Sequence, residues 1–171
     1  RYRMFGELTT NGTLWEENDI KEIVRIGWDS IGISIDAPIE SVHDSIRRVP
    51  GTFRKAKRTV ELLSSFRNKH SKERPCLIIN MVLNRLNYRY LPAMVDFVHS
   101  IGGDALFVEP MIVHSPLGEE IRLTSKEVGE LREPSVFIRN CQTISGGRFP
   151  PFFWATVLNQ LSMSSPFNSL R

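Results

Sequence analysis

The sequence predicts an α/β fold in which parallel strands alternate with helices. Strand-like and helix-like segments follow one another in four successive units. The segment Cys76–Leu83 is almost continuously apolar, which is typical of a parallel strand covered by helices. A similar helix-to-strand joint occurs twice, at residues 26–31 (IGWDSI) and 101–106 (IGGDAL), which indicates a repeated βα unit.

The first unit contains a strand over residues 4–10 and a helix that follows a short turn. Asn11 and Gly12 form a good turn pair whatever the function of the protein. The helix is predicted from apolar residues at i, i+3 and i+4 spacing, namely Ile20, Ile23 and Val24. Gly27 is expected just beyond the end of this helix, at C′.

The second unit begins with a strand over residues 30–36 that has two different faces. Ile31, Ile33 and Ile35 fall on one face, and Gly32, Ser34 and Asp36 fall on the other. A helical region follows over residues 40–66. The pair Pro50-Gly51 interrupts this region, and Thr52 is expected to be the N-cap of the second part.

The third and fourth units complete the predicted sheet. The strand Cys76–Leu83 precedes a helix whose apolar residues are Leu91, Met94, Val95 and Val98. A fourth strand is predicted over residues 105–111 and a helix over 123–131. The composition then becomes rich in Ser, Pro and Phe. We therefore expect an α/β domain over residues 1–132 and an irregular tail over residues 133–171.

Composition excludes several classes of protein. The net charge is +3, and many of the basic residues fall between positions 47 and 74. Phe53 and Phe66 are the only Phe, Tyr or Trp residues in that stretch, whereas a surface that stacks nucleic-acid bases needs more aromatic rings. A solvated helix face is therefore favoured over a nucleic-acid surface. No apolar run approaches the ~20 residues that cross a membrane, and a cytoplasmic location is expected. Cys76 and Cys141 are too far apart for a zinc motif, and Cys76 is expected to be a buried residue that opens a strand.

Polar residues follow or end all four predicted strands. In parallel α/β folds, ligands bind at the carboxyl ends of the strands, so these residues are the candidate site. They are Asn11, Ser34, Asp36, Asn80, Asn84, Glu109 and His114. Glu109 is expected on the opposite pleat face from Pro110.

Each candidate also has a purely structural interpretation. Asp36 would cap the next segment, Asn84 and Asn87 would hold the loop after the third strand, and His43 with Asp44 would form an exposed helix face. Arg47 differs because the strand–loop–helix geometry can bring it back over the strand ends as an anion binder. We find no nucleophile elbow, P-loop or dinucleotide-binding glycine motif.

Four ordered motifs carry a family resemblance: TNGTL at 10–14, GWDSIGISID at 27–36, HDSIR at 43–47 and GTF at 51–53. Their order and spacing resemble the middle of radical S-adenosylmethionine enzymes, especially the branch that modifies peptides, matures sulfatases or builds cofactors. The resemblance covers residues 5–125. It implies that the four units are the third to sixth of a partial (β/α)6 TIM-like barrel.

The resemblance also implies a cofactor and a site. S-adenosylmethionine would be cleaved reductively by a 4Fe–4S cluster, and the resulting 5′-deoxyadenosyl radical would abstract hydrogen from a peptide or a cofactor precursor. The residues implied to bind the cofactor are Asn11, Ser34, Asp36, Arg47, Asn84 and Met111. Ser34 and Asp36 would lie near the methionine carboxylate and ribose, Asn84 near the ribose, and Met111 near the adenine.

The sequence departs from the family in one important respect. The cysteine loop C-x-x-x-C-x-x-C, which holds three irons of the cluster, does not occur in this sequence, and Cys76 and Cys141 cannot supply three thiolates. Ala37 also stands where the family often has Gly. The chain is therefore expected to be a fragment that lacks the first two βα units and is inactive alone.

Two alternatives remain at this stage. The chain would be a non-catalytic binding or regulatory module derived from the barrel, with its sheet edges covered by its own tail or by a second copy in a homo-oligomer. Otherwise it would be a fragment of an unrelated (β/α)8 barrel. In such a barrel phosphate-binding glycines follow late strands, and Gly118 alone is a poor match.

Overall fold

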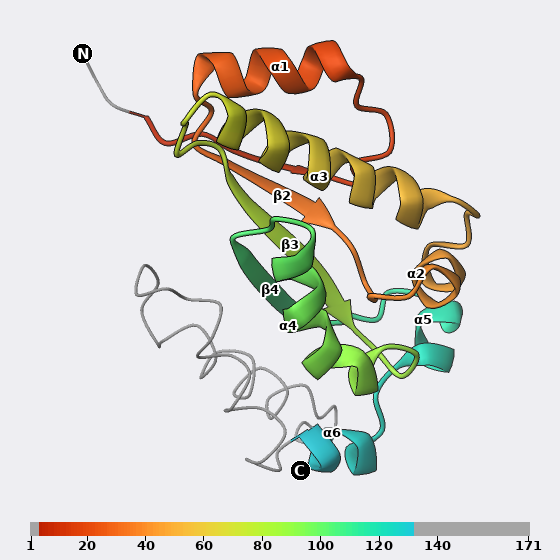
Figure 1. Ribbon diagram of the computed structural model, residues 1–171. Coiled ribbons are helices and arrows are strands. Elements are labelled where there is room, and N and C mark those ends of the chain that lie inside the picture. The colour runs from red at the N-terminus through yellow and green to blue at the C-terminus, as the bar shows by residue number, and fades with distance from the viewer. Residues whose placement is uncertain (1–3, 132–171) are drawn as a thin grey trace.

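A computed structural model describes residues 4–131, and these residues form a four-stranded parallel sheet with helices (Figure 1). The strands are β1 (Glu7–Thr10), β2 (Ser30–Ser34), β3 (Cys76–Leu83) and β4 (Ala105–Pro110). Their order in the sheet is the order in the chain, β1-β2-β3-β4, and every neighbouring pair is parallel. The predicted parallel α/β fold is confirmed.

The helices connect successive strands and then continue beyond the sheet. They are α1 (Glu17–Ile26), α2 (Glu40–Arg47), α3 (Thr52–Lys69), α4 (Leu91–Ser100), α5 (Pro116–Ile121) and α6 (Ser125–Leu131), with a short 3-10 helix η1 (Tyr88–Tyr90) before α4. Figure 1 shows α1 and α3 side by side, whereas α2 and α5 lie at the end toward which the strand arrows point. None of the helices within residues 4–131 is both long enough and apolar enough to cross a membrane.

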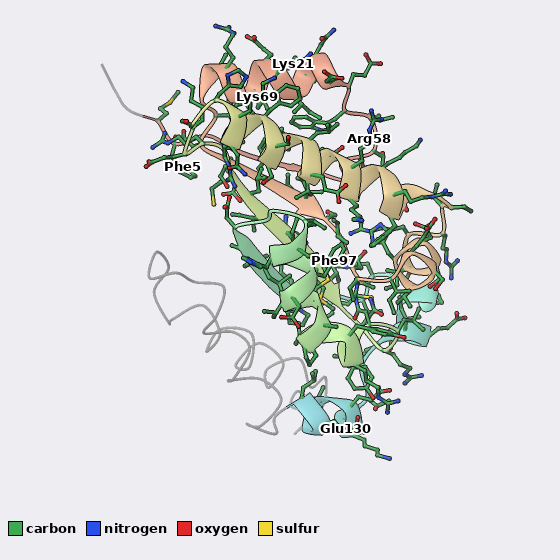
Figure 2. The ribbon with its side chains drawn as sticks, in the orientation of Figure 1. Phe5, Lys21, Arg58, Lys69, Phe97 and Glu130 are labelled. Carbon is green, nitrogen blue, oxygen red and sulfur yellow. The ribbon has the colours of Figure 1, made fainter. Side chains whose placement is uncertain are left out.

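The core lies between the sheet and α1, α3 and α4. Its central strand residues are fully buried and belong to one pleat face, namely Ile31, Ile33, Leu77, Ile79 and Met81. Figure 2 shows Phe97 of α4 directed toward α3, where its ring stacks on Phe53 with centroids 5.6 Å apart. This packing joins the helices of the second and third units over the sheet.

The other pleat face, here called the open face, is less buried. It carries Thr9, Gly32, Ser34, Cys76, Ile78, Asn80, Val82, Phe107 and Glu109, which the strand register places on the same side. Along β3 the residues alternate between half-buried and buried, so this parallel strand is fully buried on one face only. Cys76 is half-buried rather than buried. Within residues 4–131, the helices cover only the opposite face.

The predicted boundaries need three corrections. The strand expected from residue 4 begins at Glu7. The helical region is interrupted around Pro50-Gly51 as predicted, with Arg48 leaving α2 in the left-handed region at φ 56°, but the second helix continues to Lys69 rather than ending at residue 66. The N-cap of α3 is Gly51, with φ 80°, and Thr52 is its first helical residue. The prediction of Gly27 as the helix-ending residue is confirmed, since it caps α1 with φ 70°. The predicted tail over 133–171, with Cys141, lies outside the described residues.

Candidate functional site

The candidate site is the edge of the sheet where all four strands end, here called the carboxyl edge. Because every strand pair is parallel, the residues that end or follow the strands lie along this one edge. It includes all six predicted residues: Asn11 after β1, Ser34 and Asp36 at the end of β2, Arg47 at the end of α2, Asn84 after β3 and Met111 after β4. Contacts join three of them, Asp36, Arg47 and Asn84, into one cluster, and this cluster is described first.

Asp36 is a buried carboxylate at the centre of this edge. Its side chain is 1% exposed, and Oδ1 accepts a hydrogen bond from Val82 N at 3.0 Å. Oδ2 faces Arg47 Nε at 2.6 Å, an ion pair without the orientation of a hydrogen bond. Asp36 does not cap α2, whose N-cap is Ile39. The carboxylate therefore links α2 to β3.

Arg47 is held by this carboxylate at one side of its guanidinium group. Its side chain is 33% exposed, and Asp36 is the only partner recorded for it among residues 4–131. Its two terminal nitrogens remain available to a ligand. A guanidinium fixed through Nε can bind a carboxylate through these two nitrogens. The arrangement suits recognition of a ligand carboxylate beyond Asp36.

His43 is buried next to this ion pair, and the prediction of an exposed helix face is wrong for this residue. The side chain is 2% exposed, and its Nδ1 accepts a hydrogen bond from Asp36 N at 3.0 Å. The same nitrogen lies 4.0 Å from Asp36 Oδ2. Burial lowers the pKa of His43, as does Arg47, although Asp36 and Asp44 act in the opposite direction. The neutral imidazole is therefore the favoured form.

Asp44, the neighbour of His43, binds the start of α3 rather than Asp36. Its carboxylate accepts hydrogen bonds from Gly51 N at 2.5 Å, from Phe53 N at 2.8 Å and from Thr52 Oγ1 at 2.8 Å. Burial alone would raise the pKa of this carboxyl, but the three hydrogen bonds outweigh it and lower the pKa below its ordinary value. Asp44 thus supplies the cap of α3 that the sequence suggested for Thr52.

Asn84 and Asn87 hold the loop after β3, as their structural interpretation predicted. Asn87 Oδ1 accepts from Asn84 N at 2.7 Å, and Asn87 Nδ2 donates to Asp36 O at 2.8 Å. Asn84 Nδ2 donates to Val82 O at 3.1 Å, and its Oδ1 accepts from Leu86 N at 2.9 Å. Both amides are buried. The loop is thereby fixed against the backbone of Asp36.

The remaining predicted residues lie along the same edge without joining this cluster. Asn11 is exposed, and its Oδ1 accepts from Thr13 N and Thr13 Oγ1 at 3.1 Å and 2.9 Å, which confirms the turn. Ser34 is half-buried on the open face beside Asn80 of β3. Met111 is half-buried, and its backbone N donates to Leu83 O at 3.1 Å.

His43 belongs to the HDSIR motif, but the sequence did not indicate its burial or its contact with Asp36. The available signal was its position four residues before Arg47, on the same helix face, directly after the strand that ends at Asp36. On the open face, Asn80 lies against Gly32: a Cβ on Gly32 would be 2.5 Å from Asn80 Nδ2. Glu109 lies on this face too, exposed, and Pro110 falls on the other face as predicted.

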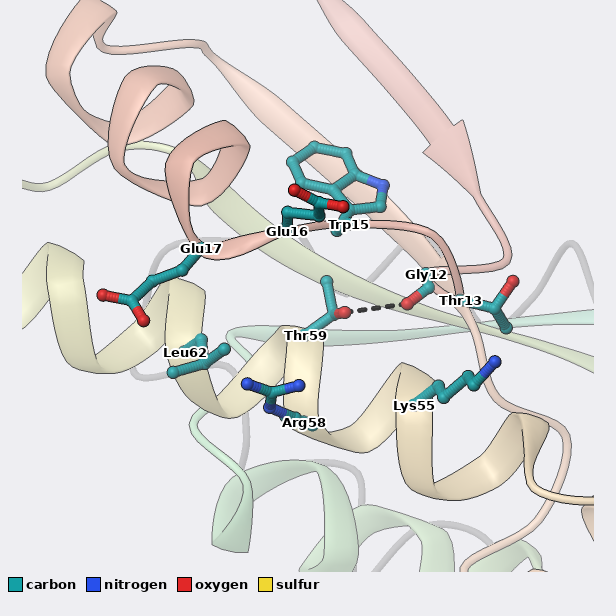
Figure 3. Close-up of a pocket in the computed structure, with 9 residues that line it drawn as sticks. All are labelled: Gly12, Thr13, Trp15, Glu16, Glu17, Lys55, Arg58, Thr59 and Leu62. Atoms are coloured by element: carbon teal, nitrogen blue, oxygen red, sulfur yellow. Dashed lines mark hydrogen bonds between the residues drawn. The ribbon is translucent and has the colours of Figure 1, made fainter.

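A separate pocket of about 260 Å³ lies on the helical side of the sheet, between α3 and the segment that joins β1 to α1 (Figure 3). Lys55 and Arg58 line it from α3, and Glu16 and Glu17 line it from the start of α1. Thr59 Oγ1 donates to Gly12 O at 2.7 Å beneath them. Two cations and two carboxylates balance one another, so the pocket does not select a ligand by net charge.

Comparison with curated proteins gives three relevant matches, whereas no family model matches the chain. An uncharacterized protein of Archaeoglobus fulgidus is 32% identical over 115 residues, which is 67% of this chain and 25% of that protein. The tungsten-containing aldehyde ferredoxin oxidoreductase cofactor-modifying protein of Pyrococcus furiosus is 26% identical over 112 residues (64% and 30%). The AdoMet-dependent heme synthase of Oleidesulfovibrio alaskensis is 26% identical over 121 residues (71% and 29%). The chain spans about a quarter to a third of these relatives.

Solved structures resemble the described fold. SuiB of Streptococcus suis matches with a TM-score of 0.57 at 14% identity, over 74% of this chain and 27% of that chain, and SuiB bound to S-adenosylmethionine matches at 0.55. The protein anSMEcpe with bound AdoMet and the Kp18Cys peptide matches at 0.53 and 20% identity, over 71% of this chain and 33% of that chain. These neighbours are radical S-adenosylmethionine enzymes, so the predicted resemblance and the partial TIM-like barrel are confirmed.

Proposed function

We propose that this chain forms the S-adenosylmethionine-binding part of a radical S-adenosylmethionine enzyme, and that the cofactor binds at the carboxyl edge. Support comes from the fold, which resembles structures solved with S-adenosylmethionine, and from a relative named as AdoMet-dependent. We also propose that the partial barrel comprises residues 1–132 and that residues 133–171 form a separate tail. In this family the bound cofactor supplies a radical that abstracts hydrogen from the substrate.

The main observation in support of the proposal is that Asp36 holds the guanidinium of Arg47 through its Nε. S-adenosylmethionine has an α-carboxylate, and Arg47 presents two terminal nitrogens that have no recorded partner within residues 4–131. Asp36 is buried, with Oδ1 bonded to Val82 N and Oδ2 paired with Arg47, so the role that we assign to it is to hold Arg47. We assign the carboxylate of the cofactor to Arg47.

We propose for the other candidate residues the roles that the resemblance implies. Ser34, on the open face, is assigned to the polar end of the cofactor, and the loop held by Asn84 is assigned to the ribose. Asn11 belongs to the floor of the same site, and the segment beginning at Met111 is assigned to the adenine. The Asn84 amide is engaged within the loop, so we assign the ribose contact to the loop as a whole rather than to this side chain alone.

The 4Fe–4S cluster that the family also uses does not fit the residues of this chain. Three thiolates are needed, and the sequence contains only Cys76 and Cys141. Cys76 begins β3 and so lies at the opposite edge of the sheet from the proposed cofactor site. Among the described residues, no three His, Cys, Asp or Glu side chains are grouped to hold a metal ion. We therefore assign no electron-transfer step to this chain.

The substrate class follows only from the relatives. One neighbour was solved with a peptide, and two relatives are named for modifying a cofactor and for haem synthesis. We propose that the whole protein acts on a peptide or a cofactor precursor. The second candidate is a module that binds S-adenosylmethionine without catalysis. Association of two copies through the sheet edges stays a prediction.

The proposal is tested by titrating the ¹⁵N-labelled chain with S-adenosylmethionine and following its amide and Arg Nε resonances. We expect shifts at Ser34, Arg47 and the Asn84 loop. Arg47→Met should weaken binding by about tenfold, the loss expected for one charge-assisted contact. Arg58→Met is the matched control, because it removes the same charge from the helical side. Absence of shifts, or equal weakening by both variants, would refute the proposal.

A further inference from the structure

We propose that His43 is a positioning residue, which as the neutral imidazole holds Asp36 and thereby fixes Arg47 for the cofactor carboxylate. The inference depends on the proposed function only in its final step, the effect on S-adenosylmethionine. Its first step, the coupling of His43 to Arg47 through Asp36, concerns the chain alone. His43 and Arg47 both contact Asp36, which therefore links them.

Helix α2 makes two contacts with Asp36, one through His43 and one through Arg47. His43 and Arg47 are four residues apart and therefore lie on the same face of the helix. His43 Nδ1 accepts from the backbone N of Asp36 at 3.0 Å, and Arg47 Nε lies 2.6 Å from its Oδ2. One contact fixes the backbone and the other fixes the carboxylate. Together they set the position of the helix end that carries Arg47.

The hydrogen bond requires one protonation state of the imidazole. Nδ1 can accept from Asp36 N only when it carries no proton, so the proton of neutral His43 is on Nε2. Protonation at Nδ1 would place two donors face to face and would bury a cation. Asp36 Oδ2, the oxygen that Arg47 faces, lies 4.0 Å from this nitrogen and would attract the added proton. Protonated His43 and Arg47 would compete for this oxygen.

The charged groups around His43 favour the neutral form on balance. Asp36 lies beyond the end of β2, and Arg47 and Asp44 belong to α2 itself. From α3, His43 meets the apolar ring of Phe53, with centroids 5.8 Å apart. Burial and Arg47 lower the pKa of His43 more than the two carboxylates raise it. Positioning of Arg47 is therefore complete at neutral pH, and it is lost as the pH falls through the pKa of His43, which lies below the ordinary histidine value of about 6.5.

The first measurement concerns the free protein. Long-range ¹H–¹⁵N spectra report the tautomer and titration of each imidazole, and Arg47 Nε reports the ion pair. We expect His43 to carry its proton on Nε2 at pH 7.5, to titrate below the ordinary histidine pKa of about 6.5, and to shift the Arg47 Nε resonance as it titrates. A proton on Nδ1, or an Arg47 Nε resonance that does not shift as His43 titrates, would overturn the inference. This outcome does not depend on whether the cofactor binds.

The second measurement is the dissociation constant of S-adenosylmethionine at pH 7.5 and at a pH about one unit below the pKa that the first measurement gives for His43, where most of the imidazole is protonated. We expect at least about threefold weaker binding at the lower pH for the unmodified chain. His43→Asn keeps a neutral acceptor near the position of Nδ1, so it should bind almost as well as the unmodified chain and without this pH dependence. His43→Leu should bind weakly at both pH values, and His70→Asn should retain the normal profile.

The outcomes separate the two proposals. If the cofactor does not bind at either pH, the proposed function fails, whereas the Arg47 Nε titration still decides the role of His43. If His43→Asn keeps the pH dependence, or if folded His43→Leu binds normally, the positioning role is wrong. If His43→Leu does not fold, His43→Asn and the tautomer measurement remain decisive.

Discussion

Asp29 and Asp104 hold equivalent positions in two helix-to-strand joints, and each accepts a backbone N–H from the neighbouring strand segment. Asp29 Oδ2 accepts from Gly6 N at 2.9 Å, and Asp104 Oδ2 accepts from Leu77 N at 2.7 Å. Each carboxylate also pairs with an arginine, Asp29 with Arg74 and Asp104 with Arg67. In both joints the aspartate therefore fixes the start of one strand against the neighbouring strand. The similar sequences at 26–31 and 101–106 reflect this shared set of contacts.

The two arginines differ in burial, and this predicts different effects of removing the two carboxylates. The Arg67 side chain is 10% exposed, and its guanidinium also donates to Pro75 O at 2.9 Å. Asp104→Ala would remove the carboxylate that pairs with this buried cation and the acceptor of Leu77 N, so we expect a loss of about 2–3 kcal/mol in the free energy of unfolding. Arg74 is 60% exposed, and Asp29→Ala should cost about 1 kcal/mol. Urea unfolding measures both.

A double variant controls for this comparison. Replacing both members of the buried pair, in Arg67→Met with Asp104→Leu, removes the unpaired charge and should recover part of the loss seen in Asp104→Ala. Equal losses for Asp29→Ala and Asp104→Ala would show that burial of the arginine does not decide the cost.

The cap of α3 gives a prediction with a defined pH dependence. Asp44→Ala removes three hydrogen bonds at the start of this helix, and we expect a loss of about 1–2 kcal/mol at pH 7. Because the pKa of Asp44 is lowered in the folded protein, its contribution is complete above the ordinary aspartate pKa of about 3.9. It is lost as the pH falls through the lowered value. Urea unfolding at pH 7 and in acid measures the difference.

Ser45→Ala is a suitable control for the cap, because Ser45 is exposed on the same helix and makes one hydrogen bond to a backbone oxygen, Val42 O. It should change stability little at either pH. A deficit of Asp44→Ala that stays constant into acid would mean that the ionised carboxylate is not the source of the stabilisation.

The sequence predicts the order of strands and helices well because their periodicities are local. The apolar alternation in β2 and the glycine after α1 are visible within one element. Burial of His43 was missed because it depends on Asp36 and on Phe53 of another helix. The cap of α3 was assigned to Thr52 for a similar reason, since its acceptor belongs to the preceding helix.

The open face could not be predicted from composition either. The apolar run of β3 reads as a strand buried on both sides, whereas helices within residues 4–131 cover only one side. Apolar residues such as Ile78 and Val82 are equally suited to a covered sheet and to the inner face of an incomplete barrel. The roles assigned to Asn11, Ser34 and Met111 rest on family resemblance and on placement at the carboxyl edge, because within residues 4–131 no side-chain contact brings these three residues together.

The cysteine count predicts the outcome of cluster reconstitution. Anaerobic treatment of the 171-residue chain with iron and sulfide should give no stable absorbance near ~410 nm, because two cysteines cannot supply three thiolates to one cluster. The double variant Cys76→Ser with Cys141→Ser should behave in the same way. A brown protein that holds about four irons per chain, and loses them in this variant, would contradict the prediction.

The contact between Gly32 and Asn80 on the open face gives the last prediction. Gly32 lies within β2, and a Cβ there would be 2.5 Å from Asn80 Nδ2 and 3.3 Å from Thr9 Oγ1. Gly32→Ala must therefore displace the Asn80 amide, and we expect it to lower the free energy of unfolding by about 1–3 kcal/mol. Asn80→Ala removes the obstacle, so the double variant should be more stable than Gly32→Ala alone. Urea unfolding of the four proteins gives the coupling energy directly. A coupling near zero would show that the added methyl meets its resistance elsewhere, at Thr9 or in the strand backbone, and that Asn80 is not held against Gly32.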